Sequence, residues 1–492
     1  MPLGPPAHRN SPSGPWPTDR TWFTLHHTSG GPGAQVKTRA TLLDHSRSIG
    51  ALIALIAGAL FVASTATAGA ATTTISAGAS IQAAIDAAAP GDVIEVSPGV
   101  YLEQIDFAGK AVTVRSLGGP DVTTNDGDSA GTVVTFDSGE GRLSVLEGFT
   151  IVGGLGTGAQ SGGVYISNAS PTVTGNIITE NQGCLGAGMA IRFSSALVQD
   201  NEIVSNHSTT GYSGCRGGGA YIGGAGAVEF VGNRVAANSA DSGGGGLEIN
   251  AAGVPYLADN IIEGNNSRSG GGIEMINVSD AVFVQNLIVA NTATEKGGGI
   301  AWSVPSSGQG PQLYHNTISG NVAPLGQAIS SDGWQDAVVV AGNILTGSTG
   351  AAVHCGATYF QGEPEFRNNI ISSTSGPSFD GLCADPVGAS GNFDADPEFE
   401  PGTYYRLGEG SPAVDSGDAA APLGALDLAG NARVVDGTGD GIAVVDRGVF
   451  ERQDAPSVTV PSEPTNQDAS RMKRSRAKVT WSAPVDDGGA PV

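Results

Sequence analysis

Short apolar runs separated by polar turns recur along the middle of the chain, from Ser161 to Gly376, and the repeats close on the pattern Asn-x-apolar-x-x-Asn, whose last position is Ser348 and Thr374 in the final two repeats. An aliphatic residue occupies the third position of this pattern every time. Subtraction gives repeat lengths of 25 to 32 residues between the first asparagines of successive patterns, which are Asn176, Asn201, Asn233, Asn260, Asn286, Asn316, Asn343 and Asn369. Internal repetition of this length predicts a solenoid with one coil per repeat.

The length and composition of the apolar runs predict strands, not helices. Each run is short and rich in β-branched side chains, whereas an amphipathic helix needs apolar residues at helical spacing over about ten or more positions. We therefore expect an all-β parallel solenoid with three short strands per coil. Coils stacked in register about 4.8 Å apart place equivalent residues over one another, so the asparagines are expected to form structural, hydrogen-bonded ladders.

Glycine clusters precede the first strand of several coils and are predicted to form corners. Glycine contributes 76 of the 492 residues, and at a corner it allows positive φ and a close approach of neighbouring coils. No Lys-Ser pair or helix pattern follows a cluster, so we do not expect phosphate binding there. The clusters are Gly217–Gly219, Gly243–Gly246, Gly270–Gly272 and Gly297–Gly299.

Residues 1–71 are predicted to be a leader that contains a signal peptide. Arg47 precedes an apolar run from Ile49 to Val62, and small residues with A-x-A spacing follow it. This run is shorter than the roughly 20 apolar residues that span a bilayer. We expect export to the extracellular space or the cell surface, with no stable membrane span in the mature chain.

A helix-then-strand pattern opens the mature chain. Ser80 is placed to cap a short amphipathic helix that starts at Ile81. The sequence SIQAAIDAAAPGDVIEVSPGVYLEQIDF, residues 80–107, resembles the N-terminal cap and first coil of the pectin-lyase-like β-helix superfamily. This resemblance implies a right-handed parallel β-helix with an N-terminal capping helix.

A second resemblance concerns the end of the solenoid. The segment from Gly391 to Phe399, together with Phe450 and Glu451, is similar to the closing region of the choice-of-anchor Q type of bacterial surface β-helix. The two resemblances imply a β-helix over residues 72–390, a closing region over residues 391–453 and an extracellular location.

Residues 454–492 are predicted to be a linker and the start of an incomplete β-sandwich. The strand around Trp481 and the Asp-Asp-Gly-Gly-Ala-Pro turn from Asp486 to Pro491 resemble the opening strands of a fibronectin type III domain. A sandwich of this kind needs about 100 residues, so only its beginning is present here.

The charge of the chain excludes one class of partner. Its formal net charge is -24, whereas nucleic-acid binding relies on Lys and Arg to neutralise phosphates. The same charge is compatible with neutral glycans, with bound cations or with solubility alone.

Four cysteines in an exported chain predict two disulfides. Cys184 and Cys215 each precede an equivalent glycine by four residues, so they are expected to stack on adjacent coils, within the distance that a disulfide bridges. Cys355 and Cys383 are also about one coil apart and are expected to pair.

One acidic segment resembles a calcium loop. Asp436 and Asp440 alternate with Gly and Thr, and Asp446 follows shortly, so oxygen ligands fall at alternating positions. Arg447 stands where an EF-hand has its bidentate glutamate. A β-turn rich in Asp and Gly is therefore the alternative interpretation of this segment. Calcium is the only cofactor that the sequence suggests.

Chemistry on such a solenoid needs side chains that point away from the core. The middle residue of the strand after each glycine cluster is predicted to face solvent, which gives the column Tyr165, Ala190, Tyr221, Glu248, Glu274 and Ala301. Stacked Glu248 and Glu274 can bind a cation, serve as the acid and nucleophile of a retaining glycosidase, or simply be solvated.

These residues do not complete a known catalytic motif. Arg192 is the nearest approach to the basic residue with which pectin-lyase-like enzymes abstract a proton, and the paired-Asp and Gly-His-Gly pattern of pectin-hydrolysing relatives is missing. The sequence also offers no arrangement of Ser, His and Asp that would define a catalytic triad. Enzymatic activity, as a glycoside hydrolase or polysaccharide lyase, therefore stays open.

Two functions compete. In the first, a secreted or cell-surface protein binds polysaccharide along the column around Tyr165, Tyr221, Glu248 and Glu274. Processing of the bound polysaccharide is a further option within this function. In the second, the β-helix and the fibronectin-like segment form a non-catalytic adhesin or spacer that extends and displays other parts.

Overall fold

The computed structural model describes residues 69–158, 160–208, 214–250, 253–277, 280–303 and 310–453, and the backbone of residues 465–472 and 476–482. The predicted signal peptide, with its apolar run from Ile49 to Val62, lies outside the described residues, as does the predicted turn from Asp486 to Pro491. Within the described residues, no helix is long and apolar enough to cross a membrane.

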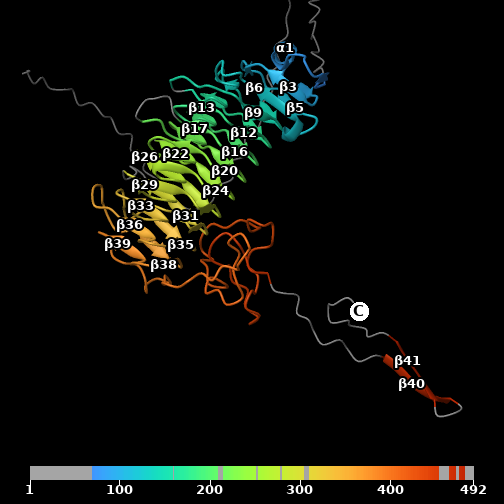
Figure 1. Cartoon of the computed structure of the whole chain (residues 1–492), viewed down its shortest axis with the longest axis vertical. Coiled ribbons are helices and arrows are strands. Elements are labelled where there is room, and N and C mark those ends of the chain that lie inside the picture. Colours follow the sequence, from blue (N-terminus) through green and yellow to red (C-terminus); the bar gives the residue numbers. More distant parts are fainter. Residues whose placement is uncertain are drawn as a thin grey trace, which may run out of the picture. The chain divides into compact units, whose positions relative to one another are not determined.

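The chain winds into a parallel β-helix in which each coil contributes one strand to each of three long sheets, and the coils follow one another in sequence order (Figure 1). Sheet A consists of β1 (Thr72–Ile75), β2 (Val93–Val96), β5 (Thr113–Ser116), β8 (Val145–Glu147), β11 (Thr172–Thr174), β15 (Leu197–Gln199), β19 (Glu229–Val231), β23 (Tyr256–Ala258), β27 (Val282–Val284), β31 (Gln312–Tyr314), β34 (Val339–Ala341) and β37 (Glu365–Arg367).

Sheet B follows sheet A around each coil. It consists of β3 (Gly99–Leu102), β6 (Thr123–Asp126), β9 (Thr150–Val152), β12 (Ile177–Thr179), β16 (Glu202–Val204), β20 (Arg234–Ala236), β24 (Ile261–Glu263), β28 (Leu287–Val289), β32 (Thr317–Ser319), β35 (Ile344–Gly347) and β38 (Ile370–Ser373).

Sheet C completes the coil. It consists of β4 (Ile105–Asp106), β7 (Val134–Phe136), β10 (Val164–Ser167), β14 (Met189–Arg192), β18 (Ala220–Gly223), β22 (Leu247–Asn250), β26 (Ile273–Ile276), β30 (Ile300–Trp302), β33 (Ile329–Ser331), β36 (Val353–Cys355) and β39 (Phe379–Gly381).

A short fourth sheet, sheet D, lies between sheets B and C in the middle coils. It consists of β13 (Gln182–Gly183), β17 (His207–Ser208), β21 (Ser239–Ala240), β25 (Asn266–Ser269) and β29 (Thr292–Lys296).

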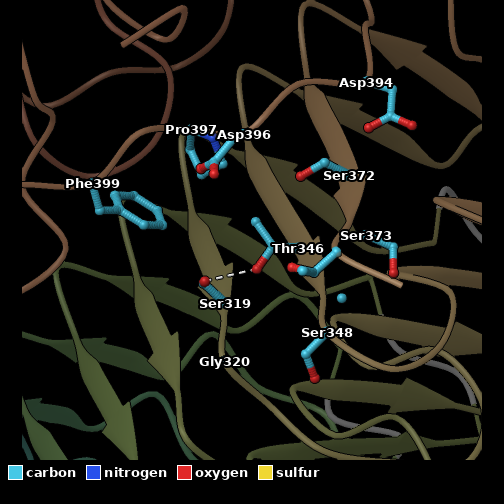
Figure 2. Close-up of a pocket in the computed structure, with 12 residues that line it drawn as sticks. Ser319, Gly320, Thr346, Ser348, Ser372, Ser373, Asp394, Asp396, Pro397 and Phe399 are labelled. Atoms are coloured by element: carbon cyan, nitrogen blue, oxygen red, sulfur yellow. Dashed lines mark hydrogen bonds between the residues drawn. The ribbon is translucent and has the colours of Figure 1, made fainter. Parts of the chain in front are cut away.

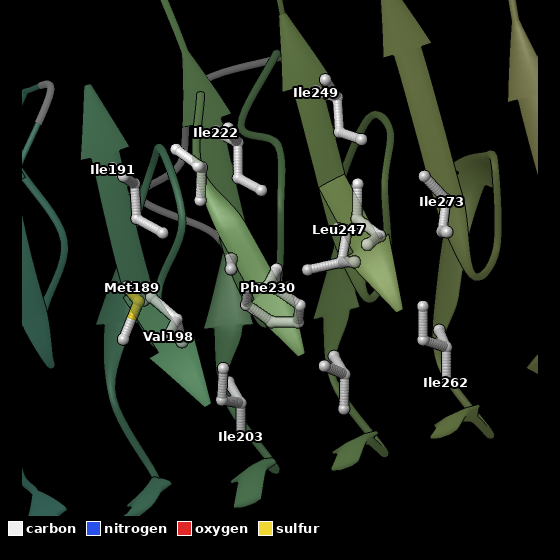
Figure 3. Close-up of a cluster of buried hydrophobic side chains, with 14 of the residues drawn as sticks. Met189, Ile191, Val198, Ile203, Ile222, Phe230, Leu247, Ile249, Ile262 and Ile273 are labelled. Carbon is white, nitrogen blue, oxygen red and sulfur yellow. The ribbon is translucent and has the colours of Figure 1, made fainter. Parts of the chain in front are cut away.

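The inward side chains of all three long sheets form one continuous apolar core (Figure 3). The predicted aliphatic column lies in it: Ile178 pairs in register with Ile203, and Ile203 with Val235, and all three are fully buried. The alternation of inward and outward residues along each strand therefore predicted correctly which side chains face the core.

Both asparagines of the repeated motif form ladders along the solenoid. In the first ladder, Asn176 Nδ2 donates to Asn201 Oδ1 at 3.0 Å, and Asn201 Nδ2 donates to Asn233 Oδ1 at 3.0 Å. In the second, Asn238 Nδ2 donates to Asn265 Oδ1 at 3.1 Å. The amides also bond backbone groups at the corners, so the structural interpretation of the asparagines is confirmed.

The two predicted disulfides are present. Cys184 and Cys215 have their Cα atoms 4.4 Å apart, and Cys355 and Cys383 have theirs 5.7 Å apart. Each bridge links neighbouring coils, as the repeat register predicted.

The predicted short helix is α1 (Ile81–Ala87). The Ser80 hydroxyl accepts from the Ala83 amide at 3.0 Å, and the Glu103 carboxylate accepts from the Ile81 amide at 2.6 Å. Ile81 and Ile85 are fully buried in the core, and the helix contacts β1, β2 and β4. A 3₁₀ turn (Pro120–Val122) lies between β5 and β6.

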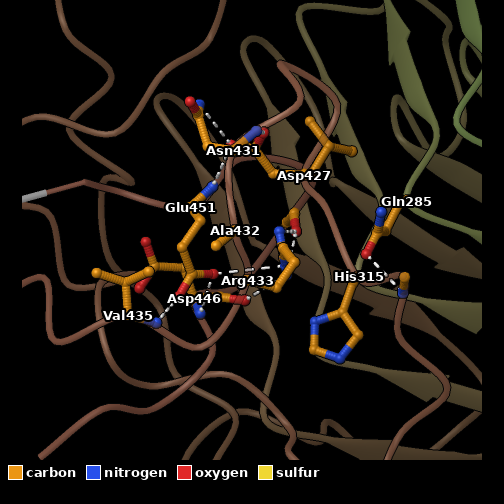
Figure 4. Close-up of polar contacts among 12 residues, drawn as sticks. Gln285, His315, Asp427, Asn431, Ala432, Arg433, Val435, Asp446 and Glu451 are labelled. Atoms are coloured by element: carbon orange, nitrogen blue, oxygen red, sulfur yellow. Dashed lines mark hydrogen bonds and ion pairs between the residues drawn. The ribbon is translucent and has the colours of Figure 1, made fainter.

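Residues 391–453 contain no regular strand and pack on the later coils of the solenoid. Arg433 is buried, donates to the Asp446 carbonyl at 3.1 Å and forms an ion pair with Glu451 at 3.4 Å (Figure 4). Burial first, and then the Glu451 charge, raise the pKa of Asp446 to about 7. His315 Nε2 bonds the Asp418 carbonyl at 3.1 Å, which ties this segment to the solenoid.

Further along, β40 (Thr465–Met472) and β41 (Arg476–Ser482) form an antiparallel pair. The second of these is the strand that was predicted around Trp481.

Candidate functional site

The predicted column lies on the outer side of sheet C, and its register is confirmed. Tyr165 pairs with Ala190, Ala190 with Tyr221, Tyr221 with Glu248, Glu248 with Glu274 and Glu274 with Ala301. Their neighbours in the strands, such as Leu247 and Ile249, point into the core, so the column points away from it.

The prediction that this column faces solvent is wrong. Glu248 is 0% exposed and Glu274 is 4% exposed, and Ala190, Tyr221 and Ala301 are also buried. Only Tyr165 is half-buried. A simply solvated pair of glutamates is therefore excluded.

A second layer of backbone covers the column. The segment before each glycine corner folds across sheet C, and its residues Leu185, Arg216, Gly243 and Ser269 pair in register along the solenoid. A Cβ at Gly243 would lie 1.5 Å from Glu274 Oε2. The carboxylate of Glu274 thus occupies the space that a side chain at position 243 would need.

Arg216, from this covering layer, binds both glutamates. Its Nη1 lies 2.6 Å from Glu274 Oε2 and 3.4 Å from Glu248 Oε1. Burial first, and next the charge of Glu274, raise the pKa of Glu248 well above its ordinary value of 4.5, although Arg216 acts in the opposite direction. Glu248 Oε2 has no hydrogen-bond partner among the described residues.

This arrangement does not fit glycosidic cleavage. The two carboxyl groups of a retaining glycosidase lie on either side of a bound sugar, about 5 Å apart and open to it. Glu248 exposes no atom to a ligand, and Arg216 holds both groups from one side. The geometry instead supports a buried structural cluster, in which one guanidinium binds two neighbouring carboxyl groups.

Arg192 and the two tyrosines do not join the glutamates in one open site. The Arg192 guanidinium lies 5.7 Å from the centre of the Phe193 ring. A Cβ at Gly223 would meet the Tyr221 ring, so this ring lies across the strand. Burial, and then the charge of Glu248, raise the pKa of Tyr221.

The outward column of sheet C continues through three residues that sequence reasoning did not connect. Ser330, His354 and Asp380 follow one another in register, and His354 Nδ1 bonds Asp380 Oδ1 at 2.6 Å. However, Ser330 is 1% exposed, because the backbone of Gly326 lies over it. The order of residues matches a Ser-His-Asp triad, but the hydroxyl is closed to a substrate.

An open hollow of about 350 Å³ lies on the outer side of sheet B, at the last coils (Figure 2). Its floor carries hydroxyl groups of β32, β35 and β38, and the segment after Asn392 forms its wall. The lining residues are Ser319, Gly320, Thr346, Gly347, Ser348, Ser372, Ser373, Thr374, Asp394, Asp396, Pro397 and Phe399.

The groups that line this hollow are held in place by neighbours. Ser319 Oγ and Thr346 Oγ1 share a hydrogen bond of 2.7 Å. Asp396 Oδ1 accepts from the Glu398 amide at 2.9 Å. The Phe399 ring packs edge-on against Tyr405, with ring centres 5.2 Å apart. The hollow therefore presents ordered hydroxyls, exposed carboxylates and one aromatic ring.

Sequence reasoning missed this hollow, although a signal exists. The residue after the aliphatic column of sheet B points outward, and in the last three coils it carries a hydroxyl: the positions are Thr179, Val204, Ala236, Glu263, Val289, Ser319, Thr346 and Ser372. The wall formed by Asp394 to Phe399 follows the last strand of the solenoid by more than ten residues in sequence, and no repeat predicts it.

The acidic loop is built as a turn. The Asp436 carboxylate accepts from the amides of Gly439, Asp440 and Gly441, while Asp446 is buried and accepts from the Asp415 and Arg452 amides. Over the part of the chain that the structure describes, no group of three or more His, Cys, Asp or Glu is arranged to hold a metal ion. Calcium binding by Asp436, Asp440 and Asp446 remains a prediction.

Comparisons with known proteins agree with the fold. Residues 212–371 match the family described as "Right handed beta helix region", so the solenoid is a right-handed parallel β-helix. No curated protein matches the chain.

Two solved structures are similar to it. The pectate lyase Pel9A has 16% sequence identity and a TM-score of 0.45, over 78% of this chain and 98% of that chain. A mutant of the PL6 family alginate lyase AlyGC has 14% identity and a TM-score of 0.39, over 68% of this chain and 55% of that chain.

Proposed function

We propose that this chain is an exported, extracellular or cell-surface β-helix protein that binds polysaccharide in the hollow on sheet B. The observation that carries the proposal is the lining of this hollow, which combines several hydroxyls and two exposed carboxylates with the ring of Phe399. The volume of about 350 Å³ lies at the lower end of the range of known ligand pockets, and the polar groups of the lining can fix the orientation of a ligand.

The chemistry of a sugar fits this lining. A sugar ring offers hydroxyls around its edge, which donate to carboxylates and exchange hydrogen bonds with serine and threonine. Its C–H faces are apolar and pack on an aromatic ring, for which Phe399 is available. Ser348 and Thr374 are exposed and Thr346 is half-buried, whereas Ser319 and Ser372 are only 5% and 8% exposed. The hydroxyls alone would therefore give weak binding, and the aromatic ring supplies the apolar contact.

Binding is favoured over cleavage. Glu248, Glu274 and Ser330 carry groups that could act in hydrolysis, but each is covered by the layer that contains Arg216, Gly243 and Gly326. The two exposed carboxylates in the hollow, those of Asp394 and Asp396, are on the same wall segment and do not face each other across a groove (Figure 2).

The display function is the second candidate. Two continuous asparagine ladders and two disulfides between coils favour a rigid rod, and the β40–β41 pair supports the proposal that a fibronectin-like domain begins there. Burial of Ile81 and Ile85 of α1 in the core supports an N-terminal cap. The choice-of-anchor Q relation of residues 391–453 belongs to the same proposal.

The substitution Phe399→Ala tests the proposal. We expect it to weaken binding to a retained polysaccharide by about tenfold, because it removes the apolar face against which a sugar ring packs. Binding of the full chain to an array of neutral and acidic polysaccharides, followed by titration with the best one, measures the effect.

Phe193→Ala is the matched control, because Phe193 is an exposed aromatic residue outside the hollow. Its affinity should equal that of the wild type. Equal affinity of all three proteins, or retention of no polysaccharide, would leave the display function as the better account.

A further inference from the structure

We infer that the hollow on sheet B accepts an uncharged glycan chain that runs along the solenoid axis, with one sugar residue over each of three successive coils. This inference rests on the proposed function and names the ligand class and its direction. It follows from the charge, the register and the length of the hydroxyl-bearing floor.

The charge of the hollow disfavours acidic glycans. Its lining contains Asp394 and Asp396, both exposed, and contains no Lys or Arg. The chain as a whole carries a net charge of -24. A uronate or sulfated sugar would place like charges a few ångströms from these carboxylates, which costs free energy that no cation of the lining offsets. Neutral sugar hydroxyls donate hydrogen bonds to the same oxygens.

The register of the floor sets the direction of the ligand. Ser319, Thr346 and Ser372 occupy equivalent outward positions on β32, β35 and β38. Neighbouring strands lie about 4.8 Å apart, which is close to the length of one sugar ring in an extended chain. Thr346 is the most open of the three, and Ser319 and Ser372 expose only 5% and 8% of their surface. A glycan that crosses the strands follows this column from coil to coil around Thr346, whereas a glycan parallel to a strand leaves it after one residue.

The fold limits the track to three coils. At the preceding coil, the equivalent position is Val289, which is buried under Val449 and Phe450 of the closing region. At the other end, β38 is the last strand of sheet B within the described residues. The wall residue Phe399 lies beside the same three coils (Figure 2). A ligand longer than about three residues gains no further contact with the floor.

The test is calorimetric titration of the full chain with oligomers of one to six residues. The probes are gluco-, xylo- and manno-oligosaccharides with β-1,4 links, and oligogalacturonates of the same lengths. We expect at least one neutral series to gain affinity up to the trimer and then level off, and the oligogalacturonates to bind at least about tenfold more weakly.

Two matched variants locate the contact. Thr346→Val, which replaces the hydroxyl at nearly constant shape, should weaken trimer binding by about tenfold. Thr179→Val changes the equivalent position on β12, outside the hollow, and should have no effect.

The outcomes separate the two proposals. If the array shows that a polysaccharide binds through Phe399 but oligogalacturonates bind as well as neutral oligomers, or affinity keeps rising beyond the trimer, or Thr346→Val binds normally, this inference is wrong and the proposed function stands. If the array retains nothing, both are wrong.

Discussion

Replacing Asn265 by alanine is expected to lower the free energy of unfolding by about 4 kcal/mol. The Asn265 side chain accepts from the backbone amide and from Nδ2 of Asn238, and it donates to the Val235 carbonyl at 2.9 Å. All of these groups are buried, so alanine leaves the Asn238 amide and the Val235 carbonyl without their partners in the core. Chemical denaturation followed by circular dichroism measures the change.

The next residue provides the control. Asn266 is exposed on sheet D, and Asn266→Ala removes the same atoms from a position outside both ladders. Its free energy of unfolding should change by less than about 0.5 kcal/mol. If the two variants were equally stable, the ladders would contribute nothing to stability, and the structural interpretation of the repeated asparagines would fail.

The second large effect is expected for Glu274→Gln, which should destabilise the fold by about 2 kcal/mol at pH 7. The substitution removes the charge that Arg216 meets at 2.6 Å. This estimate is smaller than for a fully buried pair, because Arg216 is partly exposed and solvent screens its charge.

Glu248→Gln is expected to act in the opposite direction and to stabilise the fold at pH 7, because the amide carries no charge that burial penalises. The raised pKa of Glu248 means that the native state binds more protons than the unfolded chain above pH 4.5, so stability is lost as the pH rises through and above this value. Glutamine removes this titration. The difference between variant and wild type should therefore grow from pH 4 to pH 8 in denaturation experiments.

A stabilising Glu274→Gln, or a destabilising Glu248→Gln with no pH dependence, would contradict the assignment of charges in this cluster. Neither variant should change glycan affinity, because both residues are covered. If either variant lost glycan binding, the ligand site would have to lie at the column on sheet C instead of in the hollow on sheet B.

The coil architecture could be predicted from the sequence because every coil of a β-helix repeats the same arrangement of strands, corners and buried side chains. Two features recur at each coil: the aliphatic column that includes Ile178 and Ile203, and the asparagines that begin at Asn176. Equivalent residues in successive coils therefore define how the coils align. The same register located both disulfides.

The exposure of the column on sheet C could not be predicted in this way. Strand alternation separates core from outside, but it does not reveal that the segment containing Arg216 and Gly243 folds back over the outside. The glycines that mark this fold were interpreted as simple corners. Their small size in fact makes room for the buried carboxylate of Glu274.

The hollow was missed for a different reason. Its floor is part of the repeat, and the change from Val289 to Ser319 and Thr346 is visible in the sequence. Its wall, with Asp396 and Phe399, comes from the irregular closing region, whose path depends on tertiary contacts such as those of Arg433.

Hydrogen–deuterium exchange of the full chain, with and without a saturating retained glycan, tests the central claim most directly. The account predicts slower exchange in peptides that cover β35, β38 and the wall segment Asp394 to Phe399, and unchanged exchange in peptides that cover β22 and β26. Protection confined to β22 and β26, around Glu248 and Glu274, with no change at the wall segment, would contradict it.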